Sequence, residues 1–203
     1  MAKVQPLASA ATPSPNSCSS SSYEQQSRQT YTVWMKSLVF NGNGCTVYTP
    51  DGGVAFRVDN YGCRGSHEVF FMDRAGNTLI RIRRKGFGMF RRWEILRCAH
   101  GAGEEEATPW FSVRRAEKGG AAVTMHGGAG TCYRIDGCCA RKLDYRVISG
   151  RADGAVVAEV ARKQTPAGVV LGEDVLTLTV GPEVDHLLVL GLVVVRGLMN
   201  RSL

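Results

Sequence analysis

Basic side chains concentrate in one stretch of this sequence, from Arg74 to Arg97. The stretch contains eight basic residues and one acid, Glu94, so its net charge of +7 equals that of the whole chain. Guanidinium and ammonium groups form strong charge-assisted hydrogen bonds with phosphate. Because the charges of the remaining chain are balanced, any attraction to an anionic partner should originate in this stretch.

Five of these cations form the candidate site, and alternation places three of them together. If Thr78–Lys85 is a strand, Arg81, Arg83 and Lys85 share one face, because side chains of a strand point to opposite faces in turn. The apolar Ile80 and Ile82 then occupy the other face. The pattern therefore predicts a strand with a basic outer face and an apolar inner face.

Arg91 and Arg92 extend this basic face on the following strand. The short connection before them contains Phe87, Met89 and Phe90, so the patch is basic with an aromatic edge. Such a patch suits the phosphate groups of anionic lipid headgroups at a membrane surface. The alternative is that these residues form the solvated outer face of a sheet, and the sequence leaves both interpretations open.

Catalytic and metal-binding motifs are absent from the sequence. It has no G-x-S-x-G, P-loop, H-E-x-x-H or G-x-G-x-x-G pattern, so we expect no enzymatic activity and no cofactor. The histidines are too scattered to indicate a metal site, and the carboxylate spacing of an EF-hand loop is missing. We therefore predict no bound metal.

The seven cysteines are an odd number without C-x-x-C spacing, which argues against a disulfide framework and against a zinc site. Residues 1–11 contain no continuous apolar run of secretory length. We therefore expect an intracellular, cytoplasmic protein with reduced thiols, which also reaches the periphery of the plasma membrane or the nucleus. The adjacent pair Cys138-Cys139 is assigned no role, since buried free cysteine is the commoner case.

The first 29 residues are predicted to be a disordered tail. Thr12–Arg28 is rich in Ser, Pro and Gln and has almost nothing apolar to bury. We expect this tail to be dispensable for folding, with one folded domain over residues 30–203.

The folded region alternates short segments rich in Val, Ile, Phe, Tyr and Trp with turns of Gly, Asp, Asn or Pro. Many strands at short spacing predict a sandwich or a barrel. A longer loop with the acidic run Glu104-Glu105-Glu106 interrupts the series. The clearest strand segments are Tyr31–Phe40, Gly53–Asn60, His67–Asp73, Thr78–Lys85, Arg91–Cys98, Trp110–Ala116, Ala121–His126, Cys132–Ile135, Leu143–Ser149, Val156–Lys163 and Val169–Val180.

An apolar run near the C-terminus, Val184–Met199, is predicted to be a buried helix at about residues 183–199. Pro182, Glu183 and Asp185 suit the first turn of a helix, and Arg196 suits the negative end of its dipole. The run is shorter than the roughly 20 apolar residues that a membrane span needs, so we predict no transmembrane span. A helix that is apolar on all sides must be buried on all sides, which in a β-rich chain indicates a closed barrel around it.

Three tryptophans, Trp34, Trp93 and Trp110, lie among other apolar strand residues. We interpret them as core residues and not as a platform for stacked bases. The sequence also lacks a recognised DNA-binding motif, so no direct sequence-specific binding of nucleic acid is expected. The domain is expected to be a monomer with a protein partner that no motif identifies.

Several separated motifs resemble the plant LURP-one-related family. They are Trp34-Met35-Lys36-Ser37, Arg57-Val58-Asp59-Asn60-Tyr61, Arg83-Arg84-Lys85 and Asp174-Val175-Leu176, and they occur in the order typical of that family. The resemblance covers the chain from Thr30 to about Leu198, which is nearly the whole folded region.

This resemblance implies a tubby C-terminal-like fold, which is all-β with one helix. In that fold a closed antiparallel barrel of about twelve strands surrounds a buried hydrophobic C-terminal helix. The wider superfamily contains phospholipid scramblases and tubby proteins. The tubby proteins are membrane-tethered transcription regulators that bind phosphoinositides. Family members are linked to pathogen defence in plants.

Two functions of different class follow. The first is a non-enzymatic regulatory or adaptor domain that binds anionic lipid headgroups such as phosphoinositides, with a link to transcription or plant defence. The alternative is a lipid-handling protein of scramblase type, which would need a membrane-embedded segment. The first leads because the only candidate segment is assigned to the core. An enzyme acting on a ligand inside the barrel ranks third, because a filled barrel argues against a large cavity.

Overall fold

The computed structural model describes residues 28–36, 44–59, 68–86, 91–99, 107–116, 119–127, 132–137 and 144–200. Nearly all of the predicted tail, the acidic run Glu104-Glu105-Glu106 and the pair Cys138-Cys139 lie outside these residues. The predictions made for those segments therefore stay predictions.

Twelve strands in the described residues close into a single antiparallel barrel. Strands that follow one another in the chain are paired, and β1 completes the ring by pairing with both β2 and β12. The strands are β1 (Gln29–Trp34), β2 (Gly44–Tyr48), β3 (Val54–Asp59), β4 (Glu68–Asp73), β5 (Thr78–Lys85), β6 (Arg92–Cys98), β7 (Ala107–Arg115), β8 (Ala121–Met125), β9 (Tyr133–Asp136), β10 (Tyr145–Ser149), β11 (Val156–Arg162) and β12 (Val175–Val180).

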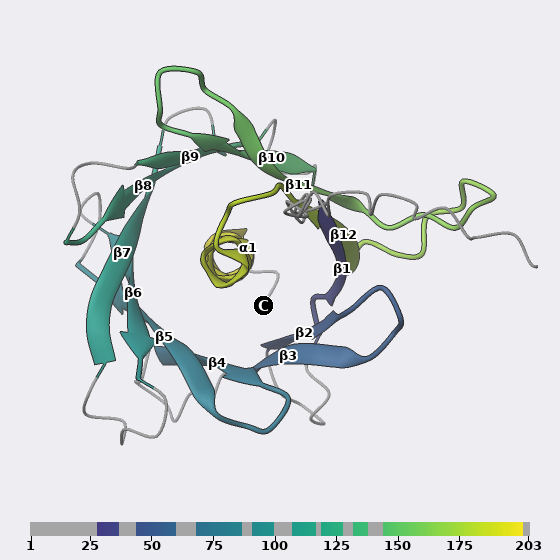
Figure 1. The fold of residues 1–203 in the computed structure, drawn as a ribbon, viewed down its shortest axis with the longest axis horizontal. Coiled ribbons are helices and arrows are strands. Elements are labelled where there is room, and N and C mark those ends of the chain that lie inside the picture. The colour runs from purple at the N-terminus through teal and green to yellow at the C-terminus, as the bar shows by residue number, and fades with distance from the viewer. Residues whose placement is uncertain are drawn as a thin grey trace, which may run out of the picture.

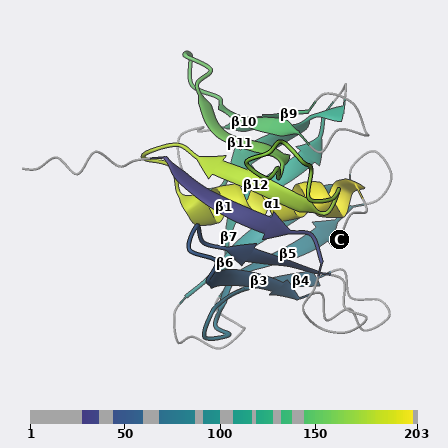
Figure 2. The same ribbon diagram turned by 90° about the vertical axis from the view of Figure 1, so that its right-hand side faces the viewer.

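Helix α1 (His186–Asn200) occupies the centre of the barrel (Figure 1). Figure 2 shows it running lengthwise through the ring of strands, behind β1 and β12. This arrangement confirms the predicted all-β fold with one C-terminal helix inside a closed barrel. The strand pattern and the apolar run were separate signals in the sequence. A helix inside the barrel accounts for both, because the apolar inner faces of the strands and the apolar surface of the helix bury one another from water.

Inward side chains of the wall and the helix form one core. Ile80 and Ile82 of β5 and Phe111 of β7 are fully buried, as is Leu192 of the helix. The helix backbone lies near this part of the wall at Gly191, where a Cβ would lie 3.1 Å from Cδ1 of Ile80 and 3.4 Å from Cζ of Phe111. Glycine at this position therefore sets how near the helix backbone lies to β5 and β7.

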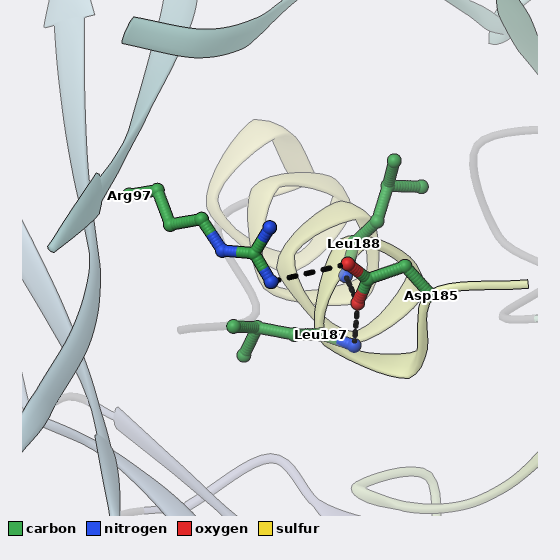
Figure 3. Close-up of polar contacts among 4 residues, drawn as sticks. All are labelled: Arg97, Asp185, Leu187 and Leu188. Atoms are coloured by element: carbon green, nitrogen blue, oxygen red, sulfur yellow. Dashed lines mark hydrogen bonds and ion pairs between the residues drawn. The ribbon is translucent and has the colours of Figure 1, made fainter. Parts of the chain in front are cut away.

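The helix begins with a capped first turn that is tied to the wall (Figure 3). Oδ1 of Asp185 accepts hydrogen bonds from the backbone N–H groups of Leu187 at 2.9 Å and Leu188 at 3.3 Å, which makes Asp185 the N-cap. Its other oxygen, Oδ2, accepts a charged hydrogen bond from Nη2 of Arg97 on β6 at 3.3 Å. Pro182 and Glu183 were predicted to lie in the first turn, but both precede the helix, which begins at His186. Glu183 has a positive φ of 62°.

Two arginines hold the other end of the helix. Arg115 of β7 donates from Nη2 to the carbonyl oxygen of Met199 at 2.8 Å, which satisfies a carbonyl of the last turn. Arg196 is buried and donates from Nη1 to the carbonyl oxygen of Gly119 at 2.7 Å. Its guanidinium also lies 5.8 Å from the ring centre of Tyr145.

Two strand predictions need correction. The short strand β2 was not predicted, because its few residues follow a Gly/Asn-rich segment that reads as a turn. The segment Val169–Val180 was predicted as one strand, whereas β12 begins only at Val175. Val169, Val170 and Leu171 instead lie on an exposed hairpin arm between β11 and β12, where no core is available to bury them.

Candidate anion-binding surface

Strands β5, β6 and β7 are neighbours on the barrel wall, at the left in Figure 1. Because Ile80 and Ile82 are buried against the interior, alternation turns Arg81, Arg83 and Lys85 to the outside. The predicted division of β5 into an apolar inner face and a basic outer face is therefore correct.

Arg81 packs beside Phe70 on the outer face of the wall. Its guanidinium carbon is 5.5 Å from the ring centre of Phe70, the residue directly opposite it on β4. On the other side it is opposite Leu96 of β6, which is buried. The side chain thus combines packing with a cation–π contact, which makes it part of the wall as well as a source of charge.

Arg83 and Lys85 share a carboxylate on the neighbouring strand. Oε2 of Glu94 accepts hydrogen bonds from Nε of Arg83 at 2.7 Å and forms ion pairs with Nη2 of Arg83 at 2.7 Å and Nζ of Lys85 at 2.9 Å. Burial alone would raise the pKa of Glu94, but the hydrogen bonds and charges of Lys85 and Arg83 outweigh it and lower that pKa. Glu94 is therefore an ionised, buried counter-ion within the predicted site.

Arg91 and Arg92 join the site from the start of β6. Arg91 is exposed just before the strand, while Arg92 lies within it and is half-buried. Arg92 is directly opposite Lys85 of β5 on one side and Arg114 of β7 on the other. Side chains directly opposite in an antiparallel pair point to the same face. We call Lys85, Arg92 and Arg114 the cation row.

Arg114 is the member of the cation row that the sequence prediction missed. It lies in the predicted strand Trp110–Ala116, of which only Trp110 was interpreted, as a core residue. The signal that could have found it is the alternation of Phe111 and Val113 with Arg114, combined with the pairing of consecutive strands. The register, which no residue pattern specified, brings the arginine beside Arg92.

Within the described part of the chain, the charge of the cation row is largely uncompensated. Like charges directly opposite one another on a sheet are destabilising. Among the described residues, neither Arg92 nor Arg114 has an ion-pair partner, while Lys85 shares Glu94 with Arg83. With neighbouring strands about 4.8 Å apart, three cations span about 10 Å, a spacing at which one anion can contact two of them.

The first and last of the family-like motifs meet on the opposite side of the barrel. Nε1 of Trp34 donates to Oδ2 of Asp174 at 3.0 Å, and Nζ of Lys36 forms an ion pair with the same oxygen at 2.8 Å. The backbone N–H of Met35 also donates to the carbonyl of Asp174 at 2.7 Å. These contacts fasten the end of β1 to the start of β12, which is a structural role.

Other candidate chemistry finds little support in the described part of the chain. It contains no cluster of His, Cys, Asp and Glu side chains arranged to hold a metal ion. His186 is hydrogen-bonded through Nδ1 to the hydroxyl of Tyr31 at 2.9 Å, so it is a partnered helix residue. Cys45 and Cys132 are free thiols, and burial together with the charge of Asp59 raises the pKa of Cys45 to about 12.

No helix among the described residues combines the length and apolar character required to cross a membrane. The central helix α1 has 15 residues.

Comparison with known proteins agrees with this fold and with the motifs. The family model described as LURP-one-related matches residues 29–197. Protein LURP-one-related 4 of Arabidopsis thaliana is 39% identical over 92% of this chain and 85% of its own length. Protein LURP-one-related 11 of the same plant is 36% identical over 89% of this chain and 82% of its own length.

Among solved structures, an X-ray structure of an Arabidopsis thaliana protein has the same fold. Its TM-score is 0.60 with 19% sequence identity, and the match covers 86% of this chain and 93% of the other. At this identity the likeness concerns the fold alone. The family match and the close relatives go further: this chain belongs to the LURP-one-related family.

Proposed function

We propose that this LURP-one-related domain is a non-enzymatic regulatory or adaptor module that attaches reversibly to anionic lipid headgroups. The observation that carries the proposal is the cation row, in which Lys85, Arg92 and Arg114 lie in register on three neighbouring strands. Such a row costs folding stability unless an anion lies across it. The proposed setting is intracellular, at the surface of a membrane, with a role in plant defence that rests on the family alone.

The proposed attachment of the domain to an anionic membrane is weak. A basic residue near an anionic membrane contributes about 1 kcal/mol, so the cation row with the exposed Arg91 supplies at most about 4 kcal/mol, which corresponds to dissociation constants of about 1 mM or weaker. The attraction is screened within about 10 Å at 0.1 M salt. Attachment of this kind is reversible, and a protein partner at the membrane would be needed to hold the domain there for longer.

Sedimentation with liposomes tests the proposal. Purified protein at low salt should sediment with vesicles of phosphatidylcholine that contain phosphatidic acid, and should remain in the supernatant with phosphatidylcholine alone. The double variant Arg92→Gln, Arg114→Gln should lose most of this binding, and added salt should release the parent protein.

A matched control separates the cation row from overall charge. Arg134→Gln with Arg146→Gln removes two positive charges from exposed, ion-paired arginines of β9 and β10. That variant should bind almost as well as the parent. Equal losses in both double variants would show that net charge alone drives the attachment, and no binding by the parent at low salt would reject the proposal.

A further inference from the structure

Glu94 lies beside the cation row, in the adjacent row of the same outer face. It is directly opposite Arg83 on β5 and Ser112 on β7, so its row contains one cation where the neighbouring row has three. The side chain of Glu94 is only 9% exposed, and that of Arg83 is 31% exposed. A buried, ionised carboxylate is thus built into the wall two residues from Arg92.

Lys85 is shared between the two rows. Its position places it opposite Arg92 in the cation row, yet its ammonium lies 2.9 Å from Oε2 of Glu94 in the row beside it. Arg83, in contrast, is directly opposite Glu94 and binds it through both Nε and Nη2. The Lys85 side chain is 42% exposed and has a flexible four-carbon stem, so it can turn from Glu94 toward an anion on the cation row.

We propose that Glu94 is an internal competitor for the lipid phosphate: it holds Lys85 while the surface is empty and yields it when a headgroup phosphate binds. The inference rests on the proposed function. A phosphomonoester carries about −1.5 to −2 charges near pH 7 and three acceptor oxygens, against a single charge on the carboxylate, so it is the stronger partner for an exposed ammonium. Glu94 therefore sets the affinity of the cation row below what its three cations would give alone.

A double-mutant cycle between Lys85 and Glu94 tests the competition. Four proteins, the parent, Lys85→Gln, Glu94→Gln and the double variant, are titrated with vesicles of phosphatidylcholine and phosphatidic acid at several salt concentrations. Glu94→Gln should bind at least about five-fold more tightly, which is the gain expected for release of Lys85 alone, and its binding should depend more steeply on salt; any gain beyond this comes from Arg83, which also loses its partner. Lys85→Gln should change binding less than two-fold in the parent but about five-fold in the Glu94→Gln background, because only there is Lys85 free to contribute.

Two controls keep the outcome specific. Glu159→Gln makes the same change of charge in the exposed ion pair with Arg146 and should leave binding within about two-fold of the parent. If Glu94→Gln does not fold, Glu94→Asp keeps the charge opposite Arg83 but is one methylene shorter, so it should release Lys85 and give the same gain. Thermal melting establishes which variants are folded.

The possible failures are distinguishable. If the parent does not bind anionic vesicles at low salt, the proposed function is rejected and the inference with it. If the parent binds but neither the Glu94→Gln nor the Glu94→Asp variant binds more tightly, or the two substitutions at Lys85 and Glu94 are additive, Glu94 is a structural counter-ion and only the inference is overturned.

Discussion

Trp34 and Asp174 are 140 positions apart in the sequence, yet the indole N–H of one donates to the carboxylate of the other over 3.0 Å. The bond lies where the first and last strands of the barrel meet, so it joins the two edges that must find one another for the ring to close. The same carboxylate oxygen pairs with Lys36. Hydrogen bonds from Lys36 and then from Trp34 are the main causes that lower the pKa of Asp174.

Stability should fall in acid because of such carboxylates. The pKa values of Asp174 and Glu94 in the folded protein lie below their ordinary values of 3.8 and 4.5. Their contribution is therefore fully present above about pH 4.5 and is lost as the pH falls through the folded pKa values, because protonation is then easier in the unfolded chain. Urea unfolding from pH 7 to pH 3 should show this loss.

The variant Asp174→Asn should be less stable than the parent at pH 7 and should lose less stability on acidification, since it lacks one of the linked protons. An unchanged dependence on pH in this variant would contradict the assignment of that proton to Asp174.

Asp185, the N-cap of the central helix, should contribute measurably to the free energy of unfolding. Asp185→Ala removes both the capping bonds and the ion pair with Arg97, and should lower the free energy of unfolding by about 1–2 kcal/mol. Asp185→Asn keeps an acceptor for the backbone N–H groups and loses only the charge, so it should cost less than about 1 kcal/mol. Chemical denaturation of both proteins gives the comparison, and equal losses would show that the ion pair outweighs the cap.

Gly191 should tolerate a methyl group far better than a larger side chain. Alanine adds a Cβ that lies 3.1 Å from Ile80, which is tight, but it also gains about 1 kcal/mol of helix propensity. We expect Gly191→Ala to lie within about 1 kcal/mol of the parent. Gly191→Leu should lose about 3 kcal/mol or fail to fold, because the added atoms must displace Ile80 or Phe111 from a packed core. A stable leucine variant would show that the helix can shift inside the barrel.

Deletion of residues 184–203 should abolish the folded state. Each buried Leu or Val of the helix contributes about 1.5–3 kcal/mol, so the loss exceeds the usual total of about 5–15 kcal/mol for a domain. Circular dichroism and gel filtration of the shortened protein provide the test. A soluble, monomeric and cooperatively unfolding product would mean that the wall closes without its central helix.

The sequence predicted the barrel and its central helix because both depend on hydrophobic pattern. Alternation along β5 and an apolar run with no polar face each have one physical solution, which is burial on one side or on all sides. It overestimated β12, because Val169 and its neighbours have strand-forming side chains and only the absence of a surface to pack on leaves them exposed.

The candidate site was predicted in part for the same reason. Charge and alternation identified Arg81, Arg83 and Lys85, but they contain no information on which residue of the next strand lies opposite. The register of the strands in the structure therefore identified two members of the site that the sequence pattern did not: Glu94 as a counter-ion and Arg114 as a further cation. Phe87, Met89 and Phe90, which were predicted to form the edge of the patch, lie outside the described residues.

The central helix follows the twelve described strands in the chain, so the ribosome makes these strands before it makes the helix. At about 5–20 residues per second, the inward face of β1 stays without its packing partner for about 8–30 s. Closure also waits for β12, the partner of β1. The barrel therefore cannot close until β12 and the helix have been made, and until then the nascent chain has unpaired strand edges and exposed apolar faces that favour aggregation.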